Sequence, residues 1–319
     1  MEIRSFRSAA LALVLVATTA SPAFAQRVIR LVVPFGPGAV QDTVARTFNA
    51  ELGQALGASV VVENRPGAGG TIGTGAVAKA TDNNTLVLAA ASHTLAGHLY
   101  SKLGYDPIKD FTGVAYIGSS GYAIAVPGTL PVNNLAEYVK HVKERNGQLN
   151  YASAGNGSAT HLGMAYFLAR AGVDMQHVPM KSTGDAVNEV LAGRVQGVTS
   201  SLIGIMAFKQ DPRMKILAYT GAQRSRFMPE LPTVAEAGVP GYKFDSWIGV
   251  LAPSTMPRAE VDKLNAALHK VLAEPVVQER LARLGVETGT LGVDEFQKLL
   301  KADYDAAGVL VKASGARIE

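Results

Sequence analysis

Three glycine-rich or polar segments could bind a small anion, because each follows a predicted strand and leads into a predicted helix. They cover residues 34–42, 91–94 and 153–161. The first N–H groups of a helix have no acceptor within the helix, and the helix dipole adds partial positive charge at that end. A carboxylate or a phosphate is therefore the ligand that these segments favour.

Several side chains in these segments have a structural interpretation beside the functional one. Asp42 stands where a helix starts, and Asp is a preferred N-cap residue. Asn156, Ser158 and Thr160 are equally typical of turns and caps. Phe35 lies between two turn-forming residues, and we expect it to line a cleft.

The common enzyme motifs are absent from the sequence. There is no G-x-S-x-G, S-x-x-K, G-x-x-x-x-G-K-[ST] or H-E-x-x-H pattern, and the G-x-G-x-x-A stretch at residues 73–78 does not directly follow a strand. His93 and His161 lack the spacing and the acidic neighbours of a metal site. A hydrolase that uses Ser153 or Ser158 with His161 is the enzyme alternative, although nothing places an acidic partner beside that histidine.

The composition excludes several further classes of protein. The chain has 319 residues, of which 48% are hydrophobic, and it has no cysteine, so disulfide scaffolds, cysteine-ligated metals and thiol nucleophiles are excluded. A formal net charge of +4, with Lys and Arg spread along the chain, provides no basic stripe for nucleic acid. The length and apolar content predict two domains with ordinary cores.

The first 25 residues are predicted to be a cleaved secretory signal. Arg4 and Arg7 precede an apolar run over residues 9–20, and cleavage is expected after Ala25 in an A-x-A pattern. A membrane anchor is the alternative, but 12 residues cover only about 18 Å as a helix, against about 30 Å of hydrocarbon. The mature protein is therefore expected to be periplasmic and free of a lipid tether.

Short β-rich runs alternate with longer helical patterns throughout the mature chain, which favours parallel sheets flanked by helices. Strands are predicted at 28–33, 59–62, 85–90, 114–117, 122–126, 150–153, 176–178, 195–199, 214–219, 242–245 and 248–252. Helices are predicted at 42–53, 135–143, 158–171, 185–192, 258–273, 275–284 and 293–312. We expect two lobes, 26–126 with 246–319 and 127–245, joined by crossings near 126–127 and 241–247.

Six segments of the mature chain are similar, in order, to motifs of one family. They are residues 34–42, 63–70, 105–111, 151–162, 231–238 and 247–253. On these segments the chain resembles the Bug receptors, the substrate-binding proteins of tripartite tricarboxylate transporters. The resemblance covers the whole mature chain.

This resemblance implies a two-lobed periplasmic binding protein of the type II kind that closes on a small carboxylate. In such receptors the carboxylate is held largely by backbone amides and ordered waters, which bond nearly as well as direct partners. The implied partners are membrane permease subunits, with no cofactor, no metal and a monomeric receptor. A sensor for a two-component kinase would use the same binding chemistry. The expected ligand contacts are Phe35, Ala39, Asp42, Ser92, His93, Asn156, Ser158, Thr160 and Ser200.

Three departures from the family pattern bear on the ligand. Gln41 replaces a small hydroxyl residue, residues 180–182 read Met-Lys-Ser, and residues 199–201 read Thr-Ser-Ser where an acidic or aromatic residue is common. Hydroxyl groups in place of a carboxylate remove repulsion against a second anionic group of the ligand. We therefore expect a dicarboxylate, either aliphatic or aromatic and terephthalate-like.

Overall fold

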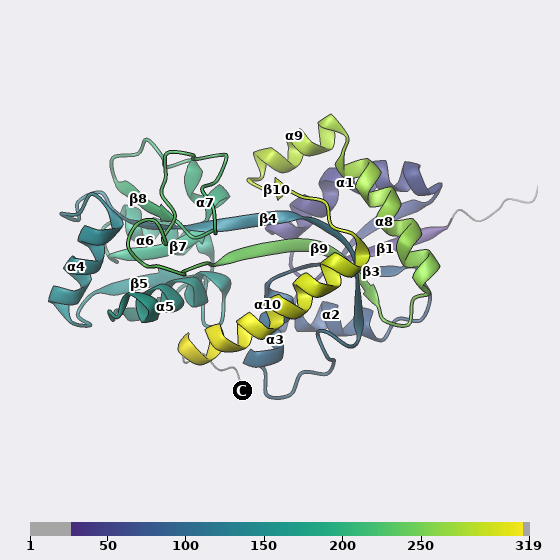
Figure 1. Ribbon diagram of the computed structural model, residues 1–319, viewed down its shortest axis with the longest axis horizontal. Helices are drawn as coiled ribbons and strands as arrows, with labels where there is room; N and C mark the ends of the chain where they lie inside the picture. Colours follow the sequence, from purple (N-terminus) through teal and green to yellow (C-terminus); the bar gives the residue numbers. More distant parts are fainter. Residues whose placement is uncertain (1–26, 315–319) are drawn as a thin grey trace, which may run out of the picture.

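The computed structural model describes residues 27–314, and Figure 1 shows this part of the chain as two lobes joined by long strands. The predicted secretory signal lies outside the described residues. The α/β class, the two lobes and the flanking helices are as the sequence predicts, although the sheets are mixed rather than wholly parallel.

Lobe 1 contains a sheet with the strand order β2-β1-β3-β9-β4, with β10 added at β4. β1 is parallel to β2 and β3, whereas β9 is antiparallel to β3 and β4. The strands are β1 (Val28–Val33), β2 (Ser59–Asn64), β3 (Thr85–Ala90), β4 (Phe111–Pro127), β9 (Asp245–Pro253) and β10 (Glu287–Thr288). The helices are α1 (Val40–Leu56), η1 (Ala68–Gly70), α2 (Thr71–Ala78), α3 (Ser92–Leu99), α8 (Arg258–Leu272), α9 (Pro275–Arg283) and α10 (Val293–Ser314).

Lobe 2 repeats this arrangement with the order β6-β5-β7-β4, and β8 pairs with β4 as well. β5 is parallel to β6 and β7, whereas β4 is antiparallel to β7 and β8. The strands are β5 (Asn150–Ser153), β6 (Gln176–Pro179), β7 (Gly197–Ser201) and β8 (Met214–Tyr219). The helices are α4 (Leu135–Arg145), α5 (Ala159–Ala171), α6 (Thr183–Leu191) and α7 (Leu202–Met206).

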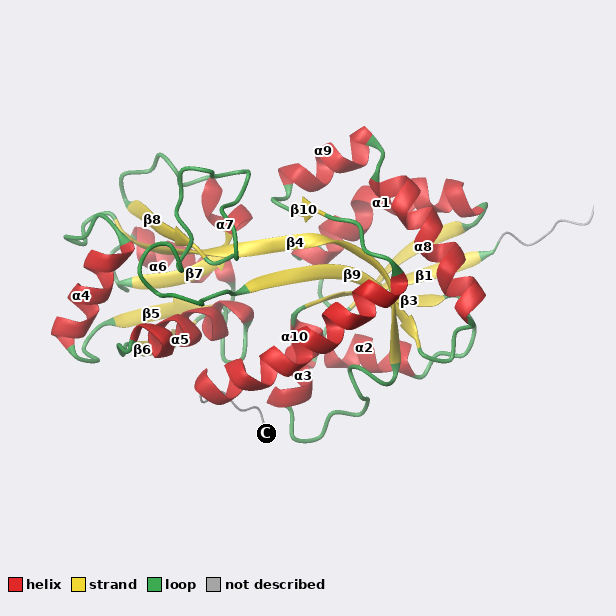
Figure 2. Cartoon of the chain, viewed as in Figure 1, coloured by secondary structure: helices red, strands yellow, loops and turns green. Residues whose placement is uncertain are grey.

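The strand β4 belongs to both lobes (Figure 2). It pairs with β9 as far as Gly121 and with β7 and β8 from Tyr122 onward. The return crossing lies where Phe244 N–H bonds to Thr220 O in lobe 2 and Asp245 pairs with Gly121. We propose these two points as the divisions between the lobes. The first lies before the crossing that the sequence suggests near residues 126–127.

The strand directions make the two lobes face one another with equivalent edges. In lobe 1, β4 runs in the same direction as β1, β2 and β3, because β9 is antiparallel to both β3 and β4. In lobe 2, β4 runs against β5, β6 and β7. The carboxyl ends of both sets of parallel strands therefore point toward the crossing. Ligands of open α/β sheets bind at such edges.

Two predicted strand pairs differ in the structure. The expected gap at residues 118–121 is extended, because this segment is hydrogen-bonded to β9 inside β4. Of the pair predicted at 242–245 and 248–252, residues 245–252 lie in the one strand β9, whereas residues 242–244 are not in a strand. Helix α2 occupies the glycine-containing stretch at 73–78, so that stretch is no dinucleotide turn.

Apolar side chains form cores on both faces of each sheet. In lobe 1, α1, α8 and α9 cover one face, and α2 and α10 cover the other. In lobe 2, α4 and α5 cover one face, and α6 and α7 cover the other. Helix α10 contributes to both lobes: Phe296 and Leu300 join a core of lobe 1, whereas Ala307 and Val311 join the core beneath α5.

Close packing of α10 on the crossing strands predicts a specific cost at Gly249. A Cβ atom there would overlap the fully buried ring of Phe296 and lie 2.9 Å from Ala115 O. Overpacking of this kind costs about 1–3 kcal/mol, so we expect Gly249→Ala to lower the free energy of unfolding by that amount in urea titration. Gly104→Ala is the matched control, since a Cβ there meets nothing within 4 Å. Equal stability of the two variants would contradict this packing.

Candidate functional site

The loop between β1 and α1 presents free amide groups at the carboxyl edge of lobe 1. Gly38 has a φ of 82°, which favours glycine, and its N–H donates to Asp42 Oδ2 at 2.9 Å. The N-cap Ala39 has no side-chain cap, and the helical ladder begins where Thr43 N–H bonds to Ala39 O. The amides of Val40 and Gln41 precede that ladder and are available to an anion.

The carboxylate of Asp42 stabilises this loop through hydrogen bonds. Its Oδ1 accepts from Arg46 Nε at 3.0 Å and from Asn64 Nδ2 at 2.9 Å, and Asn64 Nδ2 also donates to Phe35 O. Burial opposes ionisation, but the hydrogen bonds from Arg46, Gly38 and Asn64 outweigh it and lower the pKa of Asp42. The carboxylate is 4% exposed and uses both oxygens within lobe 1. In this conformation Asp42 therefore stabilises the loop rather than presenting a free carboxylate.

The other candidates of lobe 1 occupy different depths. Phe35 is half-buried beside the η1 turn, since a Cβ on Gly70 would lie 3.3 Å from its Cζ. Ser92 is half-buried and lines a small crevice with Pro34 and Gly70. These contacts bring the loops after β1, β2 and β3 together at one edge.

His93 lies deeper than we expected for a ligand contact. Its Nε2 bonds to Pro107 O at 2.8 Å, and its ring packs edge-on against Phe111 at 4.8 Å and Trp247 at 6.3 Å. Burial lowers the pKa of His93 to about 4, against a smaller opposing effect of the Pro107 bond. The ring belongs to an aromatic core of lobe 1.

The loop between β5 and α5 is the counterpart in lobe 2. Ser158 is the N-cap of α5 and accepts from His161 N–H at 3.2 Å, and its hydroxyl donates to Gly155 O at 2.7 Å. Thr160 Oγ1 accepts from Ala154 N–H at 2.8 Å. The ladder of α5 begins at Leu162 N–H, so the amides of Ala159 and Thr160 precede it. Asn156 is exposed at the tip of the loop.

Ser200 is fully buried near the end of β7. Its Oγ has no hydrogen-bond partner within residues 27–314. The same is true of Ser120 Oγ and Thr199 Oγ1. A Cβ on Gly204 would lie 2.9 Å from Ser200 Oγ, which puts this hydroxyl against the start of α7. Its contact with a ligand stays a prediction.

The candidates therefore form two groups, one in each lobe. Phe35, Ala39, Asp42 and Ser92 gather at the edge of lobe 1, and residues 156–160 gather at the edge of lobe 2. Among the described residues, the side-chain hydrogen bonds of each loop stay within its own lobe. The groups face each other across the crossing strands because of the strand directions. Closure of the lobes would place both helix N-termini on one ligand.

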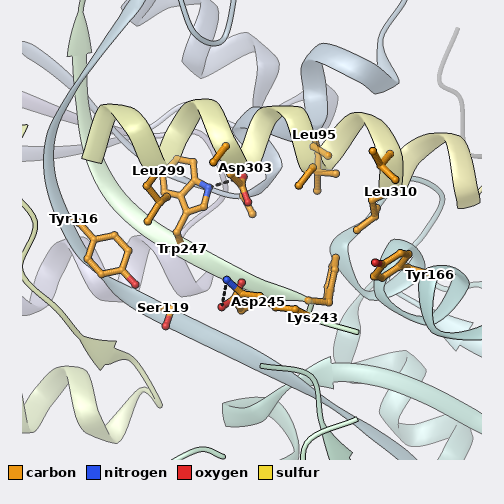
Figure 3. A pocket seen from close by; sticks show the side chains of 16 residues that line it. Leu95, Tyr116, Ser119, Tyr166, Lys243, Asp245, Trp247, Leu299, Asp303 and Leu310 are labelled. Carbon is orange, nitrogen blue, oxygen red and sulfur yellow. Dashed lines mark hydrogen bonds and ion pairs between the residues drawn. The ribbon is translucent and has the colours of Figure 1, made fainter. Parts of the chain in front are cut away.

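A cavity of about 490 Å³ lies between α10 and the crossing strands (Figure 3), and no pattern in the sequence indicates it. Its polar lining includes Lys243, which lies 3.6 Å from Asp245, and Asp303, which accepts from Trp247 Nε1 at 2.8 Å and from the Thr94 hydroxyl. Burial raises the pKa of Asp303. Two carboxyl groups beside one paired ammonium disfavour an anionic ligand, so we favour the paired loops as the anion site.

Two lobes that turn equivalent helix N-termini toward a shared crossing have the architecture of a two-lobed binding protein. The model of the tripartite tricarboxylate transporter family receptors matches residues 44–316. The chain belongs to this receptor family, whose members are periplasmic binding proteins for solutes rather than enzymes.

Solved structures agree with this assignment. The chain is similar to the periplasmic binding protein BugD, with 33% identity, a TM-score of 0.78 and coverage of 92% of this chain and 99% of that one. It is similar to Rpa4515 of R. palustris, solved with adipate, at 31% identity and TM-score 0.81, covering 92% and 100% of the two chains. It is also similar to MatC of Rhodopseudomonas palustris, solved with malate, at 31% identity and TM-score 0.76, covering 90% and 100%. Over the residues that the structure describes, no helix is long and apolar enough to cross a membrane.

Because the Asp42 carboxylate accepts hydrogen bonds that hold the loop, we expect Asp42→Ala to lower the stability of the protein. The variant removes the acceptor of the part-buried hydrogen bonds from Gly38 N–H and Asn64 Nδ2. Hydrogen bonds to a charged group contribute about 1.5–3 kcal/mol, so we expect a loss of about this size in urea unfolding at pH 7. Because the folded state lowers the pKa of Asp42, this stabilisation is present above the ordinary pKa and is lost as the pH falls through the lowered value.

Asp305→Ala is the matched control. Asp305 also forms an ion pair four residues away, with Lys301 at 3.0 Å, but both side chains are exposed. Exposed pairs contribute about 0–1 kcal/mol. If Asp42→Ala were no more destabilising than Asp305→Ala, the loop would not depend on this carboxylate.

Proposed function

We propose that the protein is a periplasmic receptor that binds a dicarboxylate, aliphatic or aromatic, and delivers it to a tripartite tricarboxylate transporter. The observation that carries this proposal is the pair of helix N-termini, α1 and α5, that the strand directions turn toward each other. Two separate sites for negative charge suit a ligand with a carboxylate at each end. Adipate and malate, with which two similar structures were solved, are both dicarboxylates.

Backbone amides would supply most of the charge recognition. Val40 and Gln41 offer N–H groups in lobe 1, and Ala159 and Thr160 offer them in lobe 2. The hydroxyls of Ser158 and Thr160 are already bonded within their loop, so they hold the amides in place and retain lone pairs for waters. No cofactor takes part, and no bond is made or broken.

The ends of the ligand would meet different surroundings. Phe35 is half-buried at the lobe 1 edge and would form an apolar wall, suited to an aliphatic chain or to a ring. The exposed amide of Asn156 would reach the ligand from lobe 2. The segment 199–201 brings hydroxyls and no carboxylate, which favours a second anionic group.

The hydrolase alternative gains a Ser–His contact that the sequence did not show, between Ser153 Oγ and His177 Nε2 at 2.6 Å. Ser153 is fully buried, however, and its Oγ also accepts from Gly155 N–H. A nucleophile must reach its substrate, so this hydroxyl is better explained as part of the loop. We therefore propose that the protein is a monomeric receptor, exported by the predicted signal, and not an enzyme.

A carboxylate panel tests the proposal. We expect adipate, malate or terephthalate to raise the unfolding temperature, and calorimetry to give a Kd near about 1 μM, or about −8 kcal/mol. Hexanoate is the matched control for adipate, because it has the same chain length and only one carboxylate. Receptor function is overturned if no carboxylate stabilises the protein, and the dicarboxylate preference is overturned if hexanoate binds as tightly as adipate.

Variants of the two loops locate the site. Asp42→Ala and Thr160→Ala each disturb the loop that presents the amides, and we expect each to weaken binding about tenfold, the loss of roughly one good hydrogen bond to a charged group. Asp305→Ala, on the exposed face of α10, should bind as the wild type does. Unchanged affinity in both loop variants would mean that the ligand binds elsewhere.

A further inference from the structure

Two histidines stack behind the loop that joins β5 to α5. The rings of His161, in α5, and His177, in β6, have centroids 4.0 Å apart and an interplanar angle of 11°. The ring of Tyr151, in β5, continues the stack, 5.0 Å from His177 and 6.4 Å from His161. The stack therefore joins three elements of lobe 2 next to the proposed ligand loop.

His161 holds one side of the loop. Its Nδ1 lies 3.1 Å from Gly157 N, and a backbone N–H can only donate, so Nδ1 accepts and carries no proton. Gly157 has a φ of 72°, in the left-handed region that favours glycine. The imidazole thus stabilises the turn immediately before the N-cap Ser158.

His177 holds the other side. Its Nε2 lies 2.6 Å from Ser153 Oγ, and Ser153 Oγ accepts from Gly155 N–H at 3.1 Å. Gly155 has a φ of 108°, a conformation that favours glycine as at Gly157. Each of the two left-handed glycines is therefore tied to one imidazole, Gly157 directly and Gly155 through Ser153.

We propose that His161 and His177 are positioning residues for the ligand loop, and that the loop presents its amides correctly only while the imidazole of His161 is neutral. This inference rests on the proposed function, because it assigns the control of the same anion site. A proton on His161 Nδ1 would turn the acceptor of Gly157 N–H into a donor and break that bond. Two cationic rings at 4.0 Å would also repel each other. Acidification should therefore release the loop and weaken ligand binding.

The surroundings keep the pair neutral at pH 7. Burial lowers the pKa of His161 to about 4, with a further contribution from His177, and burial lowers the pKa of His177 as well. The titratable group that faces the pair from β5 is Tyr151, whose pKa is raised by burial and by Asp174 in the turn before β6. A neutral phenol adds no charge to the stack, so the change in the loop follows the histidines.

A pair of His161 variants separates the hydrogen bond from the ring. His161→Phe keeps an aromatic ring in the stack but loses the acceptor for Gly157 N–H, and we expect adipate affinity at pH 7.5 to fall about tenfold. His161→Asn offers an amide oxygen near the position of Nδ1 and cannot titrate. It should restore affinity to within about threefold of the wild type. His141→Phe, in α4 and outside the stack, is the control and should change nothing.

The pH dependence of adipate affinity separates control by the protonation of His161 from a purely structural role, because a purely structural role does not depend on that protonation. We expect wild-type affinity to fall as the pH is lowered from 7.5 to 3.5, through the lowered pKa of His161 of about 4, and His161→Asn to fall less. The ratio of the two affinities at each pH cancels the titration of adipate itself. A ratio that stays constant over this range would overturn control by His161.

A measurement without ligand separates this inference from the proposed function. Hydrogen exchange of the peptide over residues 153–161, at pH 7.5, should be at least about fivefold faster in His161→Phe than in the wild type and close to wild type in His161→Asn, since loop opening exposes these amides. Unchanged exchange in His161→Phe would overturn the positioning role. If exchange responds as expected and adipate does not bind, the positioning role holds and only the proposed ligand fails.

Discussion

The pairing of β4 with strands of both lobes is the interaction on which the rest of the structure depends. Its partner changes from β9 at Gly121 to β7 at Tyr122, and the register shifts in β4 lie away from this junction. Its direction relative to the parallel strands of each lobe turns both carboxyl edges toward the same crossing. The site follows from this arrangement, because the loops after β1 and β5 are then brought face to face with their helix N-termini exposed.

In the proposed site, the recognition of charge would depend on partial charges rather than on fixed ones. The carboxylate of Asp42 and the hydroxyls of Ser158 and Thr160 are engaged in holding loops, and Arg46 is paired with Asp42. What remains open toward the ligand is backbone. Such a site pays little desolvation cost compared with a buried ammonium or guanidinium, and it can accept ligands of different length between two ends of the same type.

The sequence predicted the fold well where periodicity and turn chemistry agree with the tertiary environment. Most strand and helix positions follow from local pattern, and so do the loops that start α1 and α5. The junction at residues 118–121 does not, because its glycines and serines are typical of turns and only pairing with β9 keeps them extended. The depth of His93 does not follow from its position after β3, because its neighbours Pro107, Phe111 and Trp247 come from distant segments; its contact with a ligand stays a prediction. His177 was missed for the same reason: its partners Ser153 and His161 are set by strand pairing and not by spacing.

The place of β9 in the sheet determines when the protein can fold. β9 lies between β3 and β4, which precede it by more than a hundred residues, and Ala307 and Val311 complete a core that includes Leu95 and Leu99. The N-terminal strands of lobe 1 cannot close their sheet until the last quarter of the chain is available, whereas the sheet of lobe 2 is built from one continuous stretch. Lobe 2 can therefore form its sheet during synthesis, whereas lobe 1 cannot complete its sheet until β9 has been synthesised.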